Sequence, residues 1–371
     1  MVDLVTQYNK IKKEVDEAVI RVMETAAFIN GPEVHDFQKE LEKYLDVKHV
    51  IPCANGTDAL QIAMMGLGLQ PGDEVITTTF TFVATAEVIA LLKLRPILVD
   101  SDPETFLIDT EALEHAITPK TKAIVPVHLF GQCANMNEIM AIAKKHNLFV
   151  VEDAAQAIGA DYTMADGTIK KAGTIGTIGA TSFFPSKNLG CFGDGGAIFT
   201  NDDALAEEMR MIVNHGMKRR YYHDTIGVNS RLDSIQAAIL RIKLNLLDSY
   251  NLARQRSAAI YDEGFANHPN IEVPKRAENS THVFHQYTLR IIGKDRNGLQ
   301  EFLSSKNIPA MIYYPVALHQ QKAYLDERYT DHDFPKTERI LDEVISLPMH
   351  SELSLDQQEF IIETVIEYLN Q

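Results

Sequence analysis

Apolar positions recur at helical spacing over residues 8–30 and 33–45, with a Gly-Pro break between the two stretches. Beyond residue 45, short apolar runs typical of buried strands alternate with helix-spaced segments. The predicted strands cover residues 50–52, 74–77, 96–99, 123–127, 149–152, 181–184 and 196–200. The predicted helices between them cover residues 57–67, 81–94 and 135–146. This alternation predicts an α/β fold, with a large αβα domain around a central, mostly parallel sheet.

The pattern changes in the last third of the chain. A long amphipathic helix is expected over residues 233–267, followed by a strand over 281–291 and a helix over 299–306. A length of 371 residues exceeds the size at which one hydrophobic core stops growing. We therefore predict a large domain over residues 1–245, which includes the N-terminal helices, and a smaller C-terminal α+β domain over 246–371.

Composition and charge narrow the classes of function. Apolar residues make up 45% of the chain and charged residues 23%, as in ordinary globular proteins. The net charge of −16 argues against a nucleic acid or an anionic membrane as partner. The three cysteines show no Cys-x-x-Cys spacing, no His-Glu-x-x-His zinc helix occurs, and no metal site is predicted. Without a signal-peptide pattern or a long apolar run, the expected location is the cytoplasm.

One acidic side chain stands at the end of a predicted strand. In Phe149-Val-Val-Glu-Asp153, the strand ends in Asp153 and small residues follow it. Ligands of open α/β sheets bind at the carboxyl edge of the strands. A simple N-cap of the following helix is an equally good interpretation of this segment alone.

A lysine with small and apolar neighbours is the second candidate. Lys187 lies in Ser182-Phe-Phe-Pro-Ser-Lys187-Asn-Leu-Gly190, and Gly193-Asp-Gly-Gly196 follows. Hydroxyls and glycines allow an anion to come close to the backbone, and the apolar neighbours are expected to depress the pKa of an amine. Such a lysine suits Schiff-base chemistry, although a solvated surface lysine is the ordinary alternative. The glycine spacing does not match a dinucleotide-binding Gly-x-Gly-x-x-Gly turn, which disfavours a nicotinamide oxidoreductase.

A strand–turn–helix junction is the third candidate. The segment Asn55-Gly56-Thr57 precedes a predicted helix, whose free N–H groups carry a partial positive charge. Capping of the helix and binding of a phosphate are both compatible with this junction.

Together these segments resemble the DegT/DnrJ/EryC1/StrS family of sugar aminotransferases, which are fold-type I pyridoxal-phosphate enzymes. The resemblance covers nearly the whole chain. It is carried by Asn55-Gly56-Thr57, Thr81-Phe82-Val83-Ala84-Thr85, His128-Leu129-Phe130-Gly131, Glu152-Asp153-Ala-Ala-Gln156, Ser182 to Gly190, Gly193 to Gly196, and Gly227-Val228-Asn229-Ser230-Arg231.

The resemblance implies the chemistry of the site. Lys187 would form the Schiff base with pyridoxal 5'-phosphate and later move a proton, while Asp153 would pair with the pyridine nitrogen. Gln156 would touch the ring oxygen of the cofactor. Phe82 would stack on the ring, unless it is a core aromatic, because Phe80 would point the same way on a strand.

The family pattern also implies how phosphate and substrate are held. Phosphate contacts would come from Gly56, Thr57 and Ser182, and from Asn229 of a neighbouring subunit, which requires a homodimer with shared active sites. Tyr314, His319 and Arg231 are the candidate substrate residues. A structural ion pair for Arg231 and an ordinary loop role for His319 remain alternatives.

The implied activity is transfer of an amino group, with glutamate as donor, to a nucleotide-linked 3- or 4-keto sugar in amino-sugar biosynthesis for a polysaccharide or secondary metabolite. Relatives that carry histidine in place of the Schiff-base lysine perform dehydration, and lysine at position 187 favours amino transfer. Two alternatives stay open. One is a pyridoxal-phosphate-dependent dehydratase of the same family, and the other is a regulatory or sensor protein that binds the cofactor without turnover.

Overall fold

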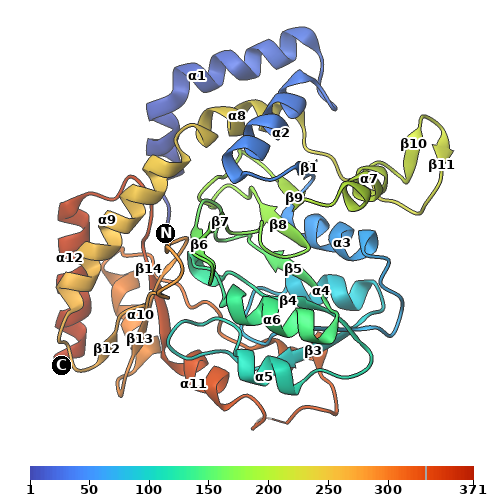
Figure 1. Ribbon diagram of the computed structural model, residues 1–371. Coiled ribbons are helices and arrows are strands. Elements are labelled where there is room, and N and C mark those ends of the chain that lie inside the picture. The colour runs from blue at the N-terminus through green and yellow to red at the C-terminus, as the bar shows by residue number, and fades with distance from the viewer. Residues whose placement is uncertain (331) are drawn as a thin grey trace.

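A seven-stranded sheet forms the centre of the large body in the computed structural model, which describes residues 1–330 and 332–371 (Figure 1). Its spatial order is β1-β9-β8-β5-β4-β2-β3, and β9 alone runs against the other strands of this sheet. The strands are β1 (His49–Cys53), β2 (Glu74–Thr78), β3 (Arg95–Val99), β4 (Thr121–Val125), β5 (Phe149–Asp153), β8 (Ile178–Ser182) and β9 (Gly196–Thr200). This sheet confirms the predicted α/β architecture.

Helices cover both faces of this sheet. As a result its central strands are buried on both sides, and every residue of β2 and β9 is buried. One apolar core includes side chains of α5 and α6, and the opposite one includes side chains of α3, α4 and α7. The helices are α3 (Gly56–Gly66), α4 (Ala84–Leu91), α5 (Thr110–His115), α6 (Met136–His146) and α7 (Asp203–Ile212).

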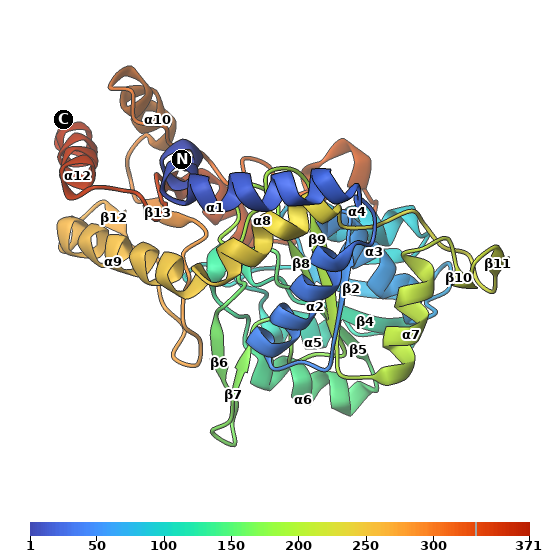
Figure 2. The same cartoon turned by 90° about the horizontal axis from the view of Figure 1, so that it is seen from above.

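Three further helices close the top of the body in Figure 1. They are α1 (Leu4–Thr25), α2 (Pro32–Leu45) and α8 (Ser234–Leu244), and α8 contacts both of the others. Two short hairpins leave the main sheet, namely β6 (Asp161–Thr163) with β7 (Ile169–Lys171), and β10 (Met217–Arg219) with β11 (Tyr222–His223). The β10–β11 hairpin stands away from the body in both ribbon views (Figures 1 and 2).

The C-terminal part has a core of its own around an antiparallel three-stranded sheet. Its elements are α9 (Leu247–Phe265), β12 (Ile271–Glu272), β13 (Tyr287–Ile291), α10 (Arg296–Ser305), α11 (Pro335–Glu343), β14 (Val344–Leu347) and α12 (Leu355–Leu369), with 3-10 turns at Leu318–Gln320 and Lys322–Tyr324. Figure 2 shows α9, α10 and α12 grouped beside the large body. The N-terminus reaches this part, where Met349 N–H donates to the Met1 carbonyl at 3.2 Å.

Several predicted elements differ from the observed ones. The single helix expected over 233–267 is two helices, α8 and α9, because the former packs into the large body and the latter onto the small sheet. The break falls at Asn245 and Leu246, where Leu246 N–H donates to Lys243 three residues back. The predicted domain division after residue 245 lies at this break and stays a prediction.

The strand expected over 281–291 begins only at Tyr287, and the helix expected over 81–94 begins at Ala84. Of the residues outside these shortened elements, Thr81, Phe82, His285 and Gln286 line a cavity at the edge of the large sheet. Among the described residues, no helix combines the length and the apolar character needed to cross a bilayer.

Candidate active site

A cavity of about 670 Å³ lies at the carboxyl edge of the large sheet. Strands β1, β2, β4, β5 and β8 all end at this edge, so the segments that follow them converge on the cavity. The predicted site residues that line it are Gly56, Thr57, Phe82, Asp153, Gln156, Ser182, Lys187 and Tyr314. The sequence separates these side chains by up to 258 positions, and the sheet brings them together.

Lys187 lies in the tight turn that follows β8. Its backbone N–H donates to the Phe184 carbonyl at 2.8 Å, and its side chain is partly open to the cavity. Burial lowers the pKa of the amine to about 8, and the negative charge of Asp153 opposes that shift only in part. The next residue anchors the turn, because Asn188 Nδ2 donates to Asn251 Oδ1 at 2.7 Å and to the Val283 carbonyl at 2.9 Å.

Asp153 is the last residue of β5 and is buried at the cavity wall. Its Oδ2 accepts a hydrogen bond of 2.8 Å from the Thr85 hydroxyl, and its Oδ1 accepts one of 3.2 Å from Ala155 N–H. Two donors therefore fix the direction of the carboxylate, and lone pairs remain for a third partner in the cavity. The contact with Ala155 is a local capping-type hydrogen bond, so capping and a ligand contact are compatible at this carboxylate.

The start of α3 forms the anion-binding end of the cavity. Asn55 caps the helix by accepting from Asp58 N–H at 2.8 Å, so capping and an open helix terminus coexist here. Gly56 must be glycine, since a Cβ atom there would lie 2.6 Å from Ser182 Cβ. The Thr81 hydroxyl in the same wall is buried and has no hydrogen-bond partner among the described residues.

Two phenylalanines from one turn have opposite environments. Phe80 is fully buried and packs edge-on against Phe130 and Tyr314, whereas Phe82 is 55% exposed and lines the cavity. The expectation that both would point the same way on a strand is wrong, because β2 ends at Thr78. Phe82 is therefore not a core aromatic, and its ring can cover a planar ligand.

Gln156 connects two other segments of the wall. Its Oε1 accepts from Phe130 N–H at 2.7 Å, and its Nε2 donates to the Tyr314 hydroxyl at 3.2 Å. Burial raises the pKa of Tyr314, which keeps this phenol protonated. Both side chains are thus held in fixed orientations beside Lys187 and Asp153.

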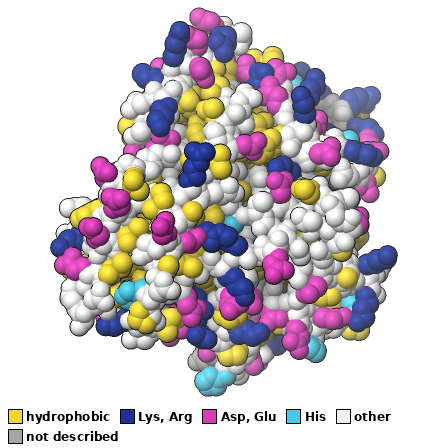
Figure 3. Space-filling view, turned by 60° about the vertical axis from the view of Figure 1, so that its left-hand side comes forward, with side chains coloured by type: hydrophobic (Ala, Val, Ile, Leu, Met, Phe, Trp, Pro, Cys, Tyr) yellow, Lys and Arg dark blue, Asp and Glu magenta, His cyan; other side chains and the backbone are white. Residues whose placement is uncertain are grey.

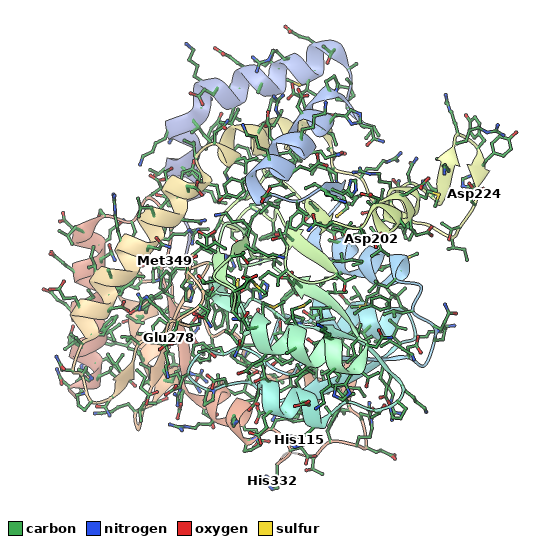
Figure 4. The ribbon with its side chains drawn as sticks, viewed as in Figure 1. His115, Asp202, Asp224, Glu278, His332 and Met349 are labelled. Atoms are coloured by element: carbon green, nitrogen blue, oxygen red, sulfur yellow. The ribbon has the colours of Figure 1, made fainter. Side chains whose placement is uncertain are left out.

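Three predicted site residues do not line this cavity. His319 is buried, its ring centroid lies 4.3 Å from that of Phe334, and its Nδ1 is 2.8 Å from the Thr79 hydroxyl oxygen. Asn229 is exposed and Arg231 is half-buried. Both follow the β10–β11 hairpin in the sequence, and Asp224, labelled in Figure 4, marks the end of that hairpin. No ion pair joins Arg231 to another residue within 1–330 and 332–371, so the structural alternative for this arginine has no support here.

His285 is a cavity residue that the sequence did not indicate. It is buried with its Nδ1 unpaired among the described residues, and burial together with the charges of Lys187 and Arg254 places its pKa well below the ordinary value. The segment before β13 carries it to the cavity, where the sequence predicted a continuous strand. Its backbone is fixed by Arg254, which donates to the carbonyls of Phe284 and His285 at 3.0 and 3.4 Å.

The described residues contain no group of three or more His, Cys, Asp or Glu side chains able to hold a metal ion. All three cysteines are free and buried. The polar groups that line the cavity instead include the Lys187 amine, the Asp153 carboxylate, the Gln156 amide and an open helix terminus. This set suits an anionic organic ligand with a planar ring.

Known proteins resemble the chain over almost its full length. Residues 9–366 match the model of the DegT/DnrJ/EryC1/StrS aminotransferase family. The UDP-2-acetamido-2-deoxy-3-oxo-D-glucuronate aminotransferase of Pseudomonas aeruginosa is 47% identical over 94% of each chain. A protein of Geobacillus stearothermophilus named pleiotropic regulatory protein is 46% identical over 99% of this chain and 98% of its own.

Among solved structures, S. venezuelae DesV in complex with a ketimine intermediate superposes with a TM-score of 0.95 and 39% identity, covering 100% of this chain and 98% of the other. Agreement in sequence and fold confirms the resemblance found from the sequence. The chain belongs to the DegT/DnrJ/EryC1/StrS aminotransferase family.

Proposed function

We propose that this protein is a pyridoxal-phosphate-dependent aminotransferase that moves an amino group from glutamate to a nucleotide-linked 3- or 4-keto sugar. The observation that carries the proposal is the convergence of the Lys187 amine, the Asp153 carboxylate and the open start of α3 on one cavity. The Pseudomonas aeruginosa relative is named for a UDP-linked 3-oxo sugar. The S. venezuelae structure contains a ketimine, an intermediate of amino transfer.

The residues present fit pyridoxal phosphate on structural grounds. The phosphate suits the terminus of α3 with Gly56, Thr57, Ser182 and the unpaired Thr81 hydroxyl, since these groups are donors beside a helix N-terminus. The exposed ring of Phe82 offers a surface for stacking. When bound, pyridoxal phosphate supplies an aldehyde for covalent attachment and a ring that accepts electrons from the substrate carbon.

Lys187 is the proposed attachment point and the proton carrier. Only a neutral amine can act as nucleophile or base, and at pH 7.5 a lysine with a pKa of about 8 is roughly one-quarter neutral. An ordinary lysine would be neutral in about one molecule per thousand at that pH. Burial at the cavity wall thus gives Lys187 Nζ the protonation state that both tasks need.

Asp153, Gln156 and Tyr314 are proposed to orient the ring. Asp153 would hold a proton on the ring nitrogen, because its carboxylate is buried at the cavity wall and already directed by Thr85 and Ala155. Gln156 would contact the ring oxygen. Tyr314 limits the substrate side of the cavity, where its hydroxyl is held by the Gln156 amide.

We further propose a homodimer with shared active sites. Among the described lining residues, Lys187 is the one Lys or Arg, while Asp58, Asp153 and Asp194 are carboxylates. Glutamate and a nucleotide diphosphate are anions, so a second cation must come from elsewhere. Arg231 of the partner subunit would supply it, and the partner subunit's Asn229 would contact the phosphate.

An apolar surface suits such a dimer. A groove between α1 and α8 is lined mainly by hydrophobic side chains, and Val5, Ile20 and Met23 in it are 70, 48 and 50% exposed. Figure 3 shows hydrophobic side chains gathered on the upper part of the molecule, at the height of α1. Exposed apolar patches of this kind mark protein interfaces.

Two alternatives remain beside this proposal. Lysine at position 187 disfavours the dehydratase branch whose members carry histidine there, but it does not remove every dehydratase of the family. The name of the Geobacillus stearothermophilus relative favours a regulatory protein that binds the cofactor without turnover. A cytoplasmic location is our expectation for all three.

The decisive experiment is reduction of the cofactor-loaded protein with borohydride, followed by peptide mapping. We expect the cofactor on Lys187, and a label on any other residue contradicts the proposal. Glutamate should convert the visible spectrum of the holoenzyme, and the converted form should then aminate 3-keto or 4-keto nucleotide sugars. A spectrum that does not respond to glutamate, with Lys187 labelled, supports the regulatory alternative.

A further inference from the structure

Two residues of the family motifs, His128 and Glu152, have no role in the proposed chemistry, yet they form a fully buried pair. Both side chains are 0% exposed, and His128 Nε2 lies 2.8 Å from Glu152 Oε2. Neither residue lines the cavity in the described part of the chain. Burial of a carboxylate is costly unless every lone pair is satisfied, so this pair requires an explanation.

Glu152 is satisfied by donors alone. Its Oε2 also accepts from Gly173 N–H at 2.9 Å, and its Oε1 accepts from Ile175 and Gly176 N–H at 2.6 and 2.5 Å. Three backbone N–H groups and one ring N–H are the partners of an ionised carboxylate, which accepts hydrogen bonds and donates none. Glu152 therefore ties the 173–176 turn to the end of β5.

The tautomer of His128 follows from its second hydrogen bond. Ala134 N–H donates to His128 Nδ1 at 3.1 Å, so Nδ1 is the acceptor and Nε2 carries the hydrogen that is donated to Glu152. The imidazole is neutral with both ring nitrogens occupied. Its orientation, and with it the position of the 128–131 segment, is fixed from two sides.

The pair is connected directly to two proposed cofactor residues. Asp153 follows Glu152 on β5, and its side chain points to the opposite face, toward the cavity. His128 N–H donates to the Asp153 carbonyl at 3.0 Å, and Phe130 N–H donates to Gln156 Oε1 at 2.7 Å. The backbone of Asp153 and the amide of Gln156 are thus held by the segment that His128 fixes.

We infer that His128 and Glu152 are positioning residues, which hold the 128–131 segment and the 173–176 turn around the end of β5. Asp153 and Gln156 then point into the cavity in the orientation that binds the cofactor ring. This inference rests on the proposed function. The carboxylate of Glu152 and the neutral ring of His128 act through hydrogen-bond geometry and touch no reacting atom.

Three variants of His128 test the inference. His128→Leu removes both hydrogen bonds, whereas His128→Gln keeps one donor for Glu152 and one acceptor for Ala134. We expect the dissociation constant for pyridoxal phosphate, from a visible absorbance titration, to rise at least tenfold in His128→Leu and by less than threefold in His128→Gln. If His128→Leu does not fold, His128→Ala, which also lacks both hydrogen-bonding groups, replaces it with the same expectation.

A matched control separates positioning from general stability. Thr288 on β13 makes an equally buried hydrogen bond of 2.8 Å to Ser346, outside the cavity lining. Thr288→Val should lower the unfolding temperature without weakening cofactor binding. The inference is overturned if His128→Leu, or His128→Ala in its place, binds the cofactor within twofold of the parent while losing stability as Thr288→Val does.

Labelling of the parent protein distinguishes a failure of the positioning inference from a failure of the proposed function. If borohydride links pyridoxal phosphate to Lys187 of the parent and the His128 variants bind it equally well, only the positioning inference fails. If the parent acquires no label on Lys187, the proposed function fails and the inference fails with it.

Discussion

The Thr85 hydroxyl donates a hydrogen bond of 2.8 Å to Asp153 Oδ2, from the first turn of α4 to the end of β5. Thr85 is 0% exposed, so bulk water has no access to this hydrogen bond. A hydrogen bond to a charged group contributes about 1.5–3 kcal/mol. We therefore expect Thr85→Val to weaken pyridoxal-phosphate binding by about 10- to 100-fold, as measured by absorbance titration.

Thr85→Ser is the control for this variant because it keeps the hydroxyl. It should bind the cofactor nearly as well as the parent. Equal affinities of the valine and serine variants would show that the carboxylate of Asp153 is directed by other contacts.

The two phenylalanines before α4 should respond oppositely to truncation. Phe82→Ala removes an exposed ring, so the free energy of unfolding should change by less than about 0.5 kcal/mol, while the loss of stacking weakens cofactor binding by about 3- to 10-fold. Phe80→Ala empties a buried site and should cost about 3–5 kcal/mol of stability. Denaturant unfolding of both apoproteins, with a cofactor titration of each, measures both effects. A Phe82→Ala protein with unchanged affinity would remove Phe82 from the site.

The pH dependence of attachment to Lys187 follows from its lowered pKa of about 8. The amine reacts only when neutral, so the rate of reductive trapping in the cofactor-free protein should rise with pH and level off above about 8. An ordinary lysine would continue to gain up to about 10.5, and at pH 8 only about one in 300 such amines is neutral, against one-half for Lys187. Peptide mapping after trapping at several pH values measures this profile.

Lys243 is an internal control for that experiment. Burial also lowers its pKa to about 8, but its side chain is 1% exposed and donates to the Gly190 carbonyl. It should stay unlabelled at every pH at which the protein is folded. A rate that keeps rising to pH 10 would indicate that burial does not depress the pKa of Lys187.

The sequence could predict the strand ends of the site because each is a local signal. Asp153 closes an apolar strand, and the Asn55-Gly56-Thr57 turn opens a helix, so both positions follow from short-range patterns. Lys187 was recognisable from its neighbours in the same segment. The sheet order that joins these segments is non-local, so the sequence predicted a mostly parallel sheet without the order of its strands.

Other residues could not be predicted for physical reasons. His285 stands alone in a stretch that alternates like a strand, and its place at the cavity depends on contacts with Arg254 and Gly131, which are distant in sequence. His319 was predicted from the family resemblance, yet its ring packs against Thr79 and Phe334 and does not line the cavity.

Helix α12 is a different case. It was not predicted, although the Ser354–Gln357 capping box is a local signal for its start.

The sharing of active sites between subunits can be tested by complementation. Lys187→Ala removes the amine of a site, and Arg231→Ala removes the cation that we assign to the neighbouring site. Each variant alone should be inactive as a homodimer. In a mixed dimer, one site keeps Lys187 from the Arg231→Ala chain and Arg231 from the Lys187→Ala chain, so it is complete.

Random reassociation of equal amounts makes half of the dimers mixed, with one complete site of two, so we expect about one-quarter of the parent activity. Activity should appear only after the subunits have exchanged, because intact homodimers of either variant contain no complete site. A mixture of Lys187→Ala with Asp153→Ala serves as the negative control, since both changes fall in the cavity of the same chain and no mixed site is complete. If Lys187→Ala with Arg231→Ala also stays inactive after exchange, Arg231 serves the cavity of its own chain. If Arg231→Ala is active by itself, Arg231 serves neither cavity.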